Sequence, residues 1–264
     1  MTTTAETSRS RPLGLVRHSA VLAKRSLVKT KRSPGYLING VMTPVIFLVL
    51  FLYLFGGAVS GSTDSYLQYL FPGILVMTTS LSGMLATGLN LNIDVKKGIF
   101  DRFRSLPIDR AAPLLGSVAA DVVRYVVAVV ILFGIGYALG FRVQSDPLST
   151  LAAVLLAVAF GFCLSWVTVF LGVLVRDEGA VLAFSFVAFL PLVLGTSLSA
   201  PVDTLPGWLR AWANVNPVTH AMDACRALLN GGAAGDAVTQ TLIWSAVLLV
   251  IFCPLAVLAY QRRE

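Results

Sequence analysis

Charged side chains, the groups that could carry most chemistry in this chain, gather in one short segment, residues 94–110. The three carboxylates there are seven and eight positions apart, and each has a Lys or Arg within two positions. Because a metal site needs its acidic ligands close together, this pattern favours a solvated, salt-bridged surface. The segment holds eight of the chain's 33 Asp, Glu, Lys and Arg residues: Asp94, Lys96, Lys97, Asp101, Arg102, Arg104, Asp109 and Arg110.

Motifs of the common hydrolases and nucleotide-binding proteins are absent from the sequence. No Gly is followed by Lys, which excludes a G-x-x-x-x-G-K-[ST] ATPase loop within the chain, and neither H-E-x-x-H nor G-x-S-x-G occurs. The three cysteines are scattered, and His220 with Asp223 supplies too few ligands for a metal. We therefore expect a protein that is not itself an enzyme and holds no metal.

Long charge-free runs set the fold class. Only 12% of the residues are charged, against about 25% in an average soluble domain. A helix needs about 20 apolar residues to cross a bilayer, and barrel strands would be shorter and alternating. The sequence predicts an all-α membrane protein with six transmembrane helices, at about residues 36–59, 68–93, 113–140, 148–175, 180–200 and 240–260.

The distribution of Lys and Arg predicts the topology. The segment before residue 33 holds eight of them and the 94–112 loop five, whereas the 60–67 loop holds none. With both termini cytoplasmic, sixteen lie inside and three outside, as the positive-inside rule requires. The basic character therefore indicates membrane topology and not a nucleic-acid partner. A cleaved signal peptide is the alternative for the first run, but its long apolar core favours a span.

The residues ahead of the first span divide into two parts. Residues 1–12 are small and polar, and we expect them to be disordered. Residues 13–31 have one apolar face and basic residues on the others, which predicts an amphipathic helix in the headgroup layer. The alternative is a basic segment that only fixes the topology. The rest of the chain, 13–264, is predicted to form a single domain.

One pair of charges falls inside a predicted span. Asp121 and Arg124 are three positions apart, so both can lie on one helix face. Charged groups inside a membrane are costly and are usually paired or turned toward the protein interior. The pair could line a polar pathway or a subunit contact, or it could be a mutual ion pair with a structural role.

The segment 201–239, between spans five and six, is long for an outer loop and not strongly polar. Pro206 with Gly207 opens one candidate helix, and Asn216 with Pro217 opens another that a Gly pair ends. Trp208 and Trp212 suit a membrane interface. We expect two short helices that dip into the membrane from outside, with their ends buried by protein.

A short helix is also predicted within the charged segment. Ile99, Phe103 and Leu106 fall on one stripe, and Gly98 and Pro107 bracket it. Such a helix would expose an apolar ridge flanked by Asp101, Arg102 and Arg104. It could insert into a groove on a partner protein, lie on lipid, or be an ordinary charged turn.

Three stretches carry a family resemblance: "FPGIL", "GIFDRFRSLPIDRAAPLLG" and "LPGWLRAWANVNPVTHAMDACRALLNGG". In this order and six-span frame, the chain resembles the ATP-binding-cassette permeases of the second type. Within them it is most similar to the daunorubicin-resistance group of bacterial drug and lipid exporters. The resemblance covers about residues 13–262.

The resemblance implies a coupling helix and an outer gate. Residues 98–107 would contact a separate ATPase subunit, with Phe103 and Leu106 as apolar contacts and Asp101, Arg102 and Arg104 as polar ones. The 13–31 helix would meet the same ATPase, and residues 208–230 would close the outer end of the pathway. Two permease chains, identical or related, would work with two ATPase subunits.

The resemblance also implies a task and a place. The partner ATPase would bind ATP and Mg, and this chain would bind no cofactor. Hydrophobic or amphipathic cargo would leave across the bacterial plasma membrane, between the two permeases and along spans one, two and five. A secondary carrier or channel is the alternative, although no repeat and only one intramembrane charge pair is seen. A membrane-embedded lipid-modifying enzyme is a further alternative. Such an enzyme needs a cluster of acidic residues, which this sequence lacks.

Overall fold

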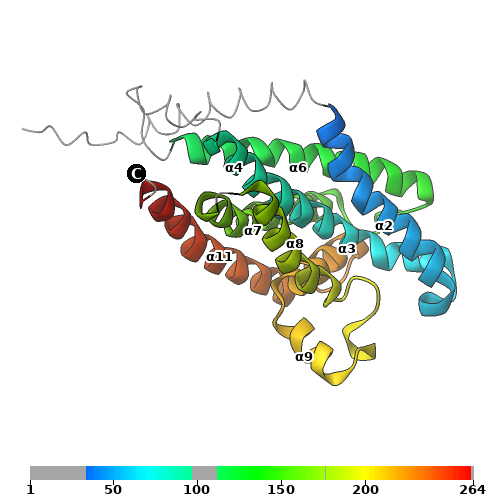
Figure 1. Ribbon diagram of the computed structural model, residues 1–264. Helices are drawn as coiled ribbons and strands as arrows, with labels where there is room; N and C mark the ends of the chain where they lie inside the picture. Colours follow the sequence, from blue (N-terminus) through cyan, green and yellow to red (C-terminus); the bar gives the residue numbers. More distant parts are fainter. Residues whose placement is uncertain (1–33, 97–111, 176, 263–264) are drawn as a thin grey trace, which may run out of the picture.

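The computed structural model describes residues 34–96, 112–175 and 177–262, and every regular element in these ranges is helical. The predicted interfacial helix at 13–31, the disordered segment at 1–12 and the coupling residues from Gly98 to Pro107 lie outside these ranges. Figure 1 shows the bundle. Its elements are α2 (Pro34–Ser60), α3 (Thr63–Leu81), η1 (Ser82–Thr87), α4 (Gly88–Lys96), α6 (Ala112–Leu139), α7 (Pro147–Leu174), α8 (Glu178–Leu194), η2 (Val202–Thr204), α9 (Gly207–Val215), α10 (Pro217–Asn230) and α11 (Gly235–Arg262).

Helices occur at all six predicted spans, but the fifth is shorter than predicted. Five helical stretches among the described residues are long and apolar enough to cross a membrane. The fifth predicted span, 180–200, is wrong at its end, because α8 stops at Leu194 after 17 residues. That length corresponds to about 25 Å, less than the hydrocarbon core of about 30 Å. The Thr196 hydroxyl donates to the Val193 carbonyl and accepts from the Leu198 N–H, which gives the backbone an alternative to the helix.

The second span begins earlier and is less regular than the sequence suggested. Ser62 caps α3, its hydroxyl accepting from the Ser65 N–H at 3.3 Å, so the helix starts at Thr63 and continues through Pro72. The irregularity lies deeper, where η1 is a π-helix of six residues that joins α3 to α4. π-helical turns are rare and are frequently found at functional sites. No feature of the sequence predicted this turn.

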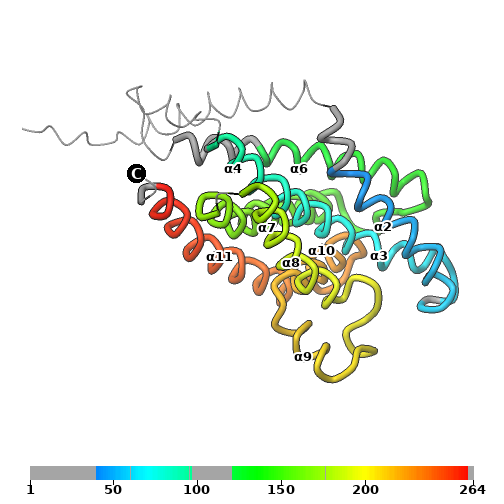
Figure 2. Tube along the Cα trace, viewed as in Figure 1, coloured from blue at the N-terminus to red at the C-terminus, as the bar shows by residue number. Residues whose placement is uncertain are grey.

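Burial separates central helices from peripheral ones. In the stretch from α3 to α4, 83% of the residues of the most apolar window are buried, against 17% in α11. Figure 2 shows α3 and α7 inside the bundle, with α10 against both. Gly88 of α4 and Gly172 of α7 let these two helices touch, because a Cβ on either would overlap backbone of the other. The poorly buried α2, α6 and α11 present apolar faces suited to lipid or another subunit.

Different elements lie at the two ends of the bundle. The last residues of α4 and of α11 lie together at one end, called here the Lys96 end, and α9 lies at the opposite one, the Trp208 end (Figure 1). The segment from α6 to α7 turns at the Trp208 end, where Asp146 caps α7. Two hydrogen bonds from Ser149 to the Asp146 carboxylate hold its pKa below the usual range.

Candidate functional site

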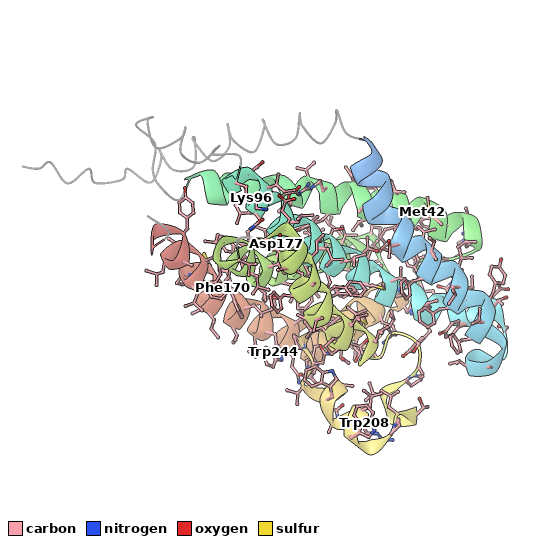
Figure 3. All side chains as sticks on the ribbon, in the orientation of Figure 1. Met42, Lys96, Phe170, Asp177, Trp208 and Trp244 are labelled. Carbon is pink, nitrogen blue, oxygen red and sulfur yellow. The ribbon has the colours of Figure 1, made fainter. Side chains whose placement is uncertain are left out.

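The described residues nearest the predicted coupling loop form a fixed corner at the Lys96 end. Lys96, the last residue of α4, lies 3.2 Å from the Glu178 carboxylate at the start of α8. The Asn92 amide donates to the carbonyls of Gly172 and Val175, at 2.9 and 2.7 Å. Figure 3 shows Lys96 and Asp177 at this corner. These contacts link the last turns of α4 to the end of α7 and to the start of α8.

The charged pair predicted inside the third span joins α6 to the π-helical turn. Arg124 forms an ion pair with Asp121, whose side chain is 5% exposed. The Thr87 hydroxyl donates to the other Asp121 oxygen and lies 3.1 Å from the Tyr125 hydroxyl. The carboxylate is thus held from two elements, and removing Arg124 alone would leave a buried charge without its counterion.

A cavity opens beside this pair, in the half of the bundle nearer the Lys96 end. Its volume is about 360 Å³. Its walls come from α2, the η1 region, α6 and α8, and most are apolar. Polar groups enter at few points, namely Arg124, Thr43 and Ser82. The walls thus belong to the first, second, third and fifth predicted spans. The cargo path was expected along the first, second and fifth of these.

The predicted outer segment contains the two short helices at the expected places. α9 begins after Pro206, and α10 begins at Pro217 with Asn216 as its N-cap. The Asn216 side chain accepts from the Val218 N–H at 2.9 Å and donates to the Leu192 carbonyl at 2.9 Å. Asn216 therefore fastens the start of α10 to the end of α8.

The two tryptophans of α9 have different surroundings. Trp212 donates from its indole N–H to the Pro191 carbonyl at 3.1 Å and packs over Gly195. Trp208 is 76% exposed and projects away from the bundle (Figure 3). An exposed tryptophan on a short helix at the end of a membrane bundle suits the interface between membrane and water.

A second polar cluster, at the Trp208 end, was not recognised from the sequence. Arg226 of α10 is paired with Asp223 at 2.5 Å, and its guanidinium carbon lies 3.9 Å from the centroid of the Tyr69 ring. It also donates to the carbonyls of Tyr69 and Ser197, at 3.1 and 2.9 Å. The Tyr69 hydroxyl donates to the Ser197 carbonyl at 2.7 Å. The spacing of Asp223 and Arg226 matches that of Asp121 and Arg124 and could have flagged the pair, but not its partners on α3.

Together these contacts place charged clusters at the two ends of the described bundle and beside a cavity.

Comparison with known proteins agrees with this arrangement. Residues 18–230 match the family model described as ABC-2 type transporter. The chain is 39% identical over 240 residues to the daunorubicin resistance ABC transporter permease protein DrrB1 of Streptomyces coeruleorubidus, covering 91% of this chain and 84% of that protein.

More distant relatives extend the match. The putative transport permease ycf38 of Cyanophora paradoxa is 32% identical, over 79% of this chain and 72% of its own. The probable doxorubicin resistance ABC transporter permease protein DrrC of Mycobacterium tuberculosis is 23% identical, over 94% and 90%. With five helices among the described residues able to cross a bilayer, these matches show that the chain is a multi-pass plasma-membrane permease and belongs to the ABC-2 type transporter family.

Proposed function

We propose that this chain is the membrane half of an exporter for hydrophobic or amphipathic compounds, driven by a separate ATPase subunit. The observation that carries the proposal is the ABC-2 match over residues 18–230, together with relatives named as drug-resistance permeases. A permease of this family works with an ATPase partner and a permease partner. Two copies of each, with ATP and Mg held by the ATPase, complete the proposed assembly.

Residues 98–107 supply the proposed contact with the ATPase. Ile99, Phe103 and Leu106 form its apolar ridge, and Asp101, Arg102 and Arg104 lie beside it. The corner formed by Asn92 and by the Lys96–Glu178 pair supports this role, because it ties the start of the loop to α7 and α8. ATP binding would move the ATPase grooves and so favour one packing of the permeases over the other.

The outer end of the path is assigned to α9 and α10. Pro206, Trp208, Trp212, Asn216 and Pro217 form the proposed outer gate. Asn216 and Trp212 support this, since both bond to carbonyls at the end of α8. If the gate opens, these hydrogen bonds must either break or move together with the end of α8.

Replacement of Phe103 tests the coupling. The permease is purified with the ATPase that co-purifies with it, both are reconstituted, and ATP-driven uptake of a fluorescent hydrophobic compound is measured. Phe103→Asp should abolish uptake and cargo-stimulated hydrolysis, because a charge replaces the apolar anchor, while the protein still inserts. Phe103→Leu is the matched control and should retain both activities. Normal transport by Phe103→Asp would remove the coupling assignment.

A further inference from the structure

The cavity beside Arg124 has the size and lining of a small-molecule site. Its volume of about 360 Å³ lies in the range of ligand pockets, about 300–1,000 Å³. Apolar side chains of five helices and the η1 turn form most of the wall, and Leu182, which is 39% exposed, shows that the wall reaches the bundle surface. Such a lining suits an apolar body of drug size.

Arg124 gives this cavity a chemical preference. Arg124 is among the lining residues, and its side chain is only 15% exposed. Asp121 is not part of the lining. The lining therefore includes the cationic member of the ion pair but not its carboxylate, which accepts from Thr87 of η1. A hydrogen bond to a charged group in such a poorly hydrated place is stronger than one in water.

The geometry also shows how Arg124 is held in place. The Asp121 carboxylate is fixed on one side by Arg124 and on the other by Thr87, the last residue of η1. Ser82, Leu85 and Ala86 of the same turn line the cavity. The π-helical turn thus forms part of the cavity wall and also anchors Asp121, which pairs with Arg124. Both contacts suit a functional role for this irregular turn.

We infer that this cavity is a binding site for the cargo, and that it takes an amphipathic molecule whose apolar body fills the cavity and whose anionic group pairs with Arg124. The inference rests on the proposed function, since it names the cargo class of the same permease. The observations that carry it are the placement of the cation, the apolar walls, and the position in the half of the bundle nearer the Lys96 end. A cargo taken from the predicted cytoplasmic side would meet this half first.

Two probes with one skeleton test the inference. Anilinonaphthalene sulfonate and N-phenylnaphthylamine share their aromatic rings, and only the first carries an anion. Binding of each is measured by fluorescence to the full-length permease in phosphatidylcholine nanodiscs, with empty nanodiscs as the blank. The wild type should bind the sulfonate about tenfold more tightly than the neutral probe, because of the charge-assisted contact with Arg124.

Variants assign the binding to the cavity. The double variant Asp121→Asn with Arg124→Gln removes the pair without leaving a lone buried charge, and should abolish the preference for the sulfonate. Ala86→Phe fills the cavity and should weaken both probes. The matched control, Asp64→Asn with Arg142→Gln, removes one exposed charge of each sign outside the cavity lining and should change neither affinity. Arg124→Lys keeps the charge and should retain a preference, which gives a readout if the double variant does not fold.

Two results would overturn the inference. If the double variant still prefers the sulfonate, the anion binds elsewhere. If both probes bind equally and Ala86→Phe does not change their binding, only lipid fills the cavity. The assay contains no ATPase and no gradient. A negative result in this binding assay would therefore leave the permease assignment intact. Conversely, if binding depends on Arg124 but ATP-driven uptake fails, only the proposed function is contradicted.

Discussion

At the scale of single residues, two Asp–Arg pairs with the same spacing do different work. Asp121 and Arg124 lie beside a cavity and tie α6 to the π-helical turn. Asp223 and Arg226 lie at the Trp208 end and tie α10 to α3 and to the Ser197 carbonyl. Each arginine also has a role outside its own helix: Arg226 donates to carbonyls of other elements, and Arg124 lines the cavity. An isolated i,i+3 ion pair on a surface has no such contacts.

Arg226→Lys should destabilise the protein by about 2 kcal/mol. A lysine keeps the charge but cannot reproduce the hydrogen bonds to the Tyr69 and Ser197 carbonyls, about 1 kcal/mol each, or the planar contact with the Tyr69 ring. The free energy of unfolding is measured by denaturant titration in mixed micelles. Arg210→Lys, at an exposed site on α9, is the control and should change it little. Equal stability of wild type and Arg226→Lys would show that this cluster does not hold α10.

The sequence identified residues that could interact, but not always their partners. The spacing of Asp121 and Arg124 indicated a shared face, and the Asn216–Pro217 start of α10 was predicted from cap chemistry. Tyr69 and Ser197 escaped notice because they are 128 positions apart and carry no motif. Contacts of that range depend on how the helices pack, which periodicity along one chain does not encode.

At the scale of elements, hydrophobic runs predicted the helices well and their ends poorly. Charge-free length reports where a helix can cross a membrane, whereas the ends depend on local bonds. α3 starts five residues before the prediction because Ser62 caps it, and α8 ends early because Thr196 bonds to nearby backbone. The π-helical turn was missed because its residues, Ser82–Thr87, read as ordinary helix in the sequence.

Asn216→Ala should cost about 1 to 2 kcal/mol and loosen α10. The change removes the N-cap of a helix and the bond to the Leu192 carbonyl, both at a buried position. Hydrogen exchange of α10 amides, followed by mass spectrometry, should show faster exchange in the first turn. Asn214→Ala, two positions earlier and exposed, is the matched control and should leave exchange unchanged. Slow exchange in Asn216→Ala would mean that packing alone fixes this helix.

At the scale of the whole molecule, contacts brace both ends of the bundle, and the cavity lies in one half of it. α10 is bonded to α3 and to the end of α8, while α4 and α7 touch through Gly88 and Gly172. The cavity lies between α2 and α8, nearer the Lys96 end, where the charged segment attaches. This arrangement suits the proposed coupling, because the cavity lies in the half of the bundle to which the charged segment attaches.

ATP-driven uptake by reconstituted vesicles tests the central claim, that this chain moves cargo only when a separate ATPase drives it. Proteoliposomes are prepared with the permease alone, with the ATPase alone and with both, and accumulation of a fluorescent amphiphile is followed after ATP addition. We predict accumulation only when both proteins are present, and none when a non-hydrolysable ATP analogue replaces ATP. Accumulation by the permease alone, at the same rate with or without ATP, would contradict the account.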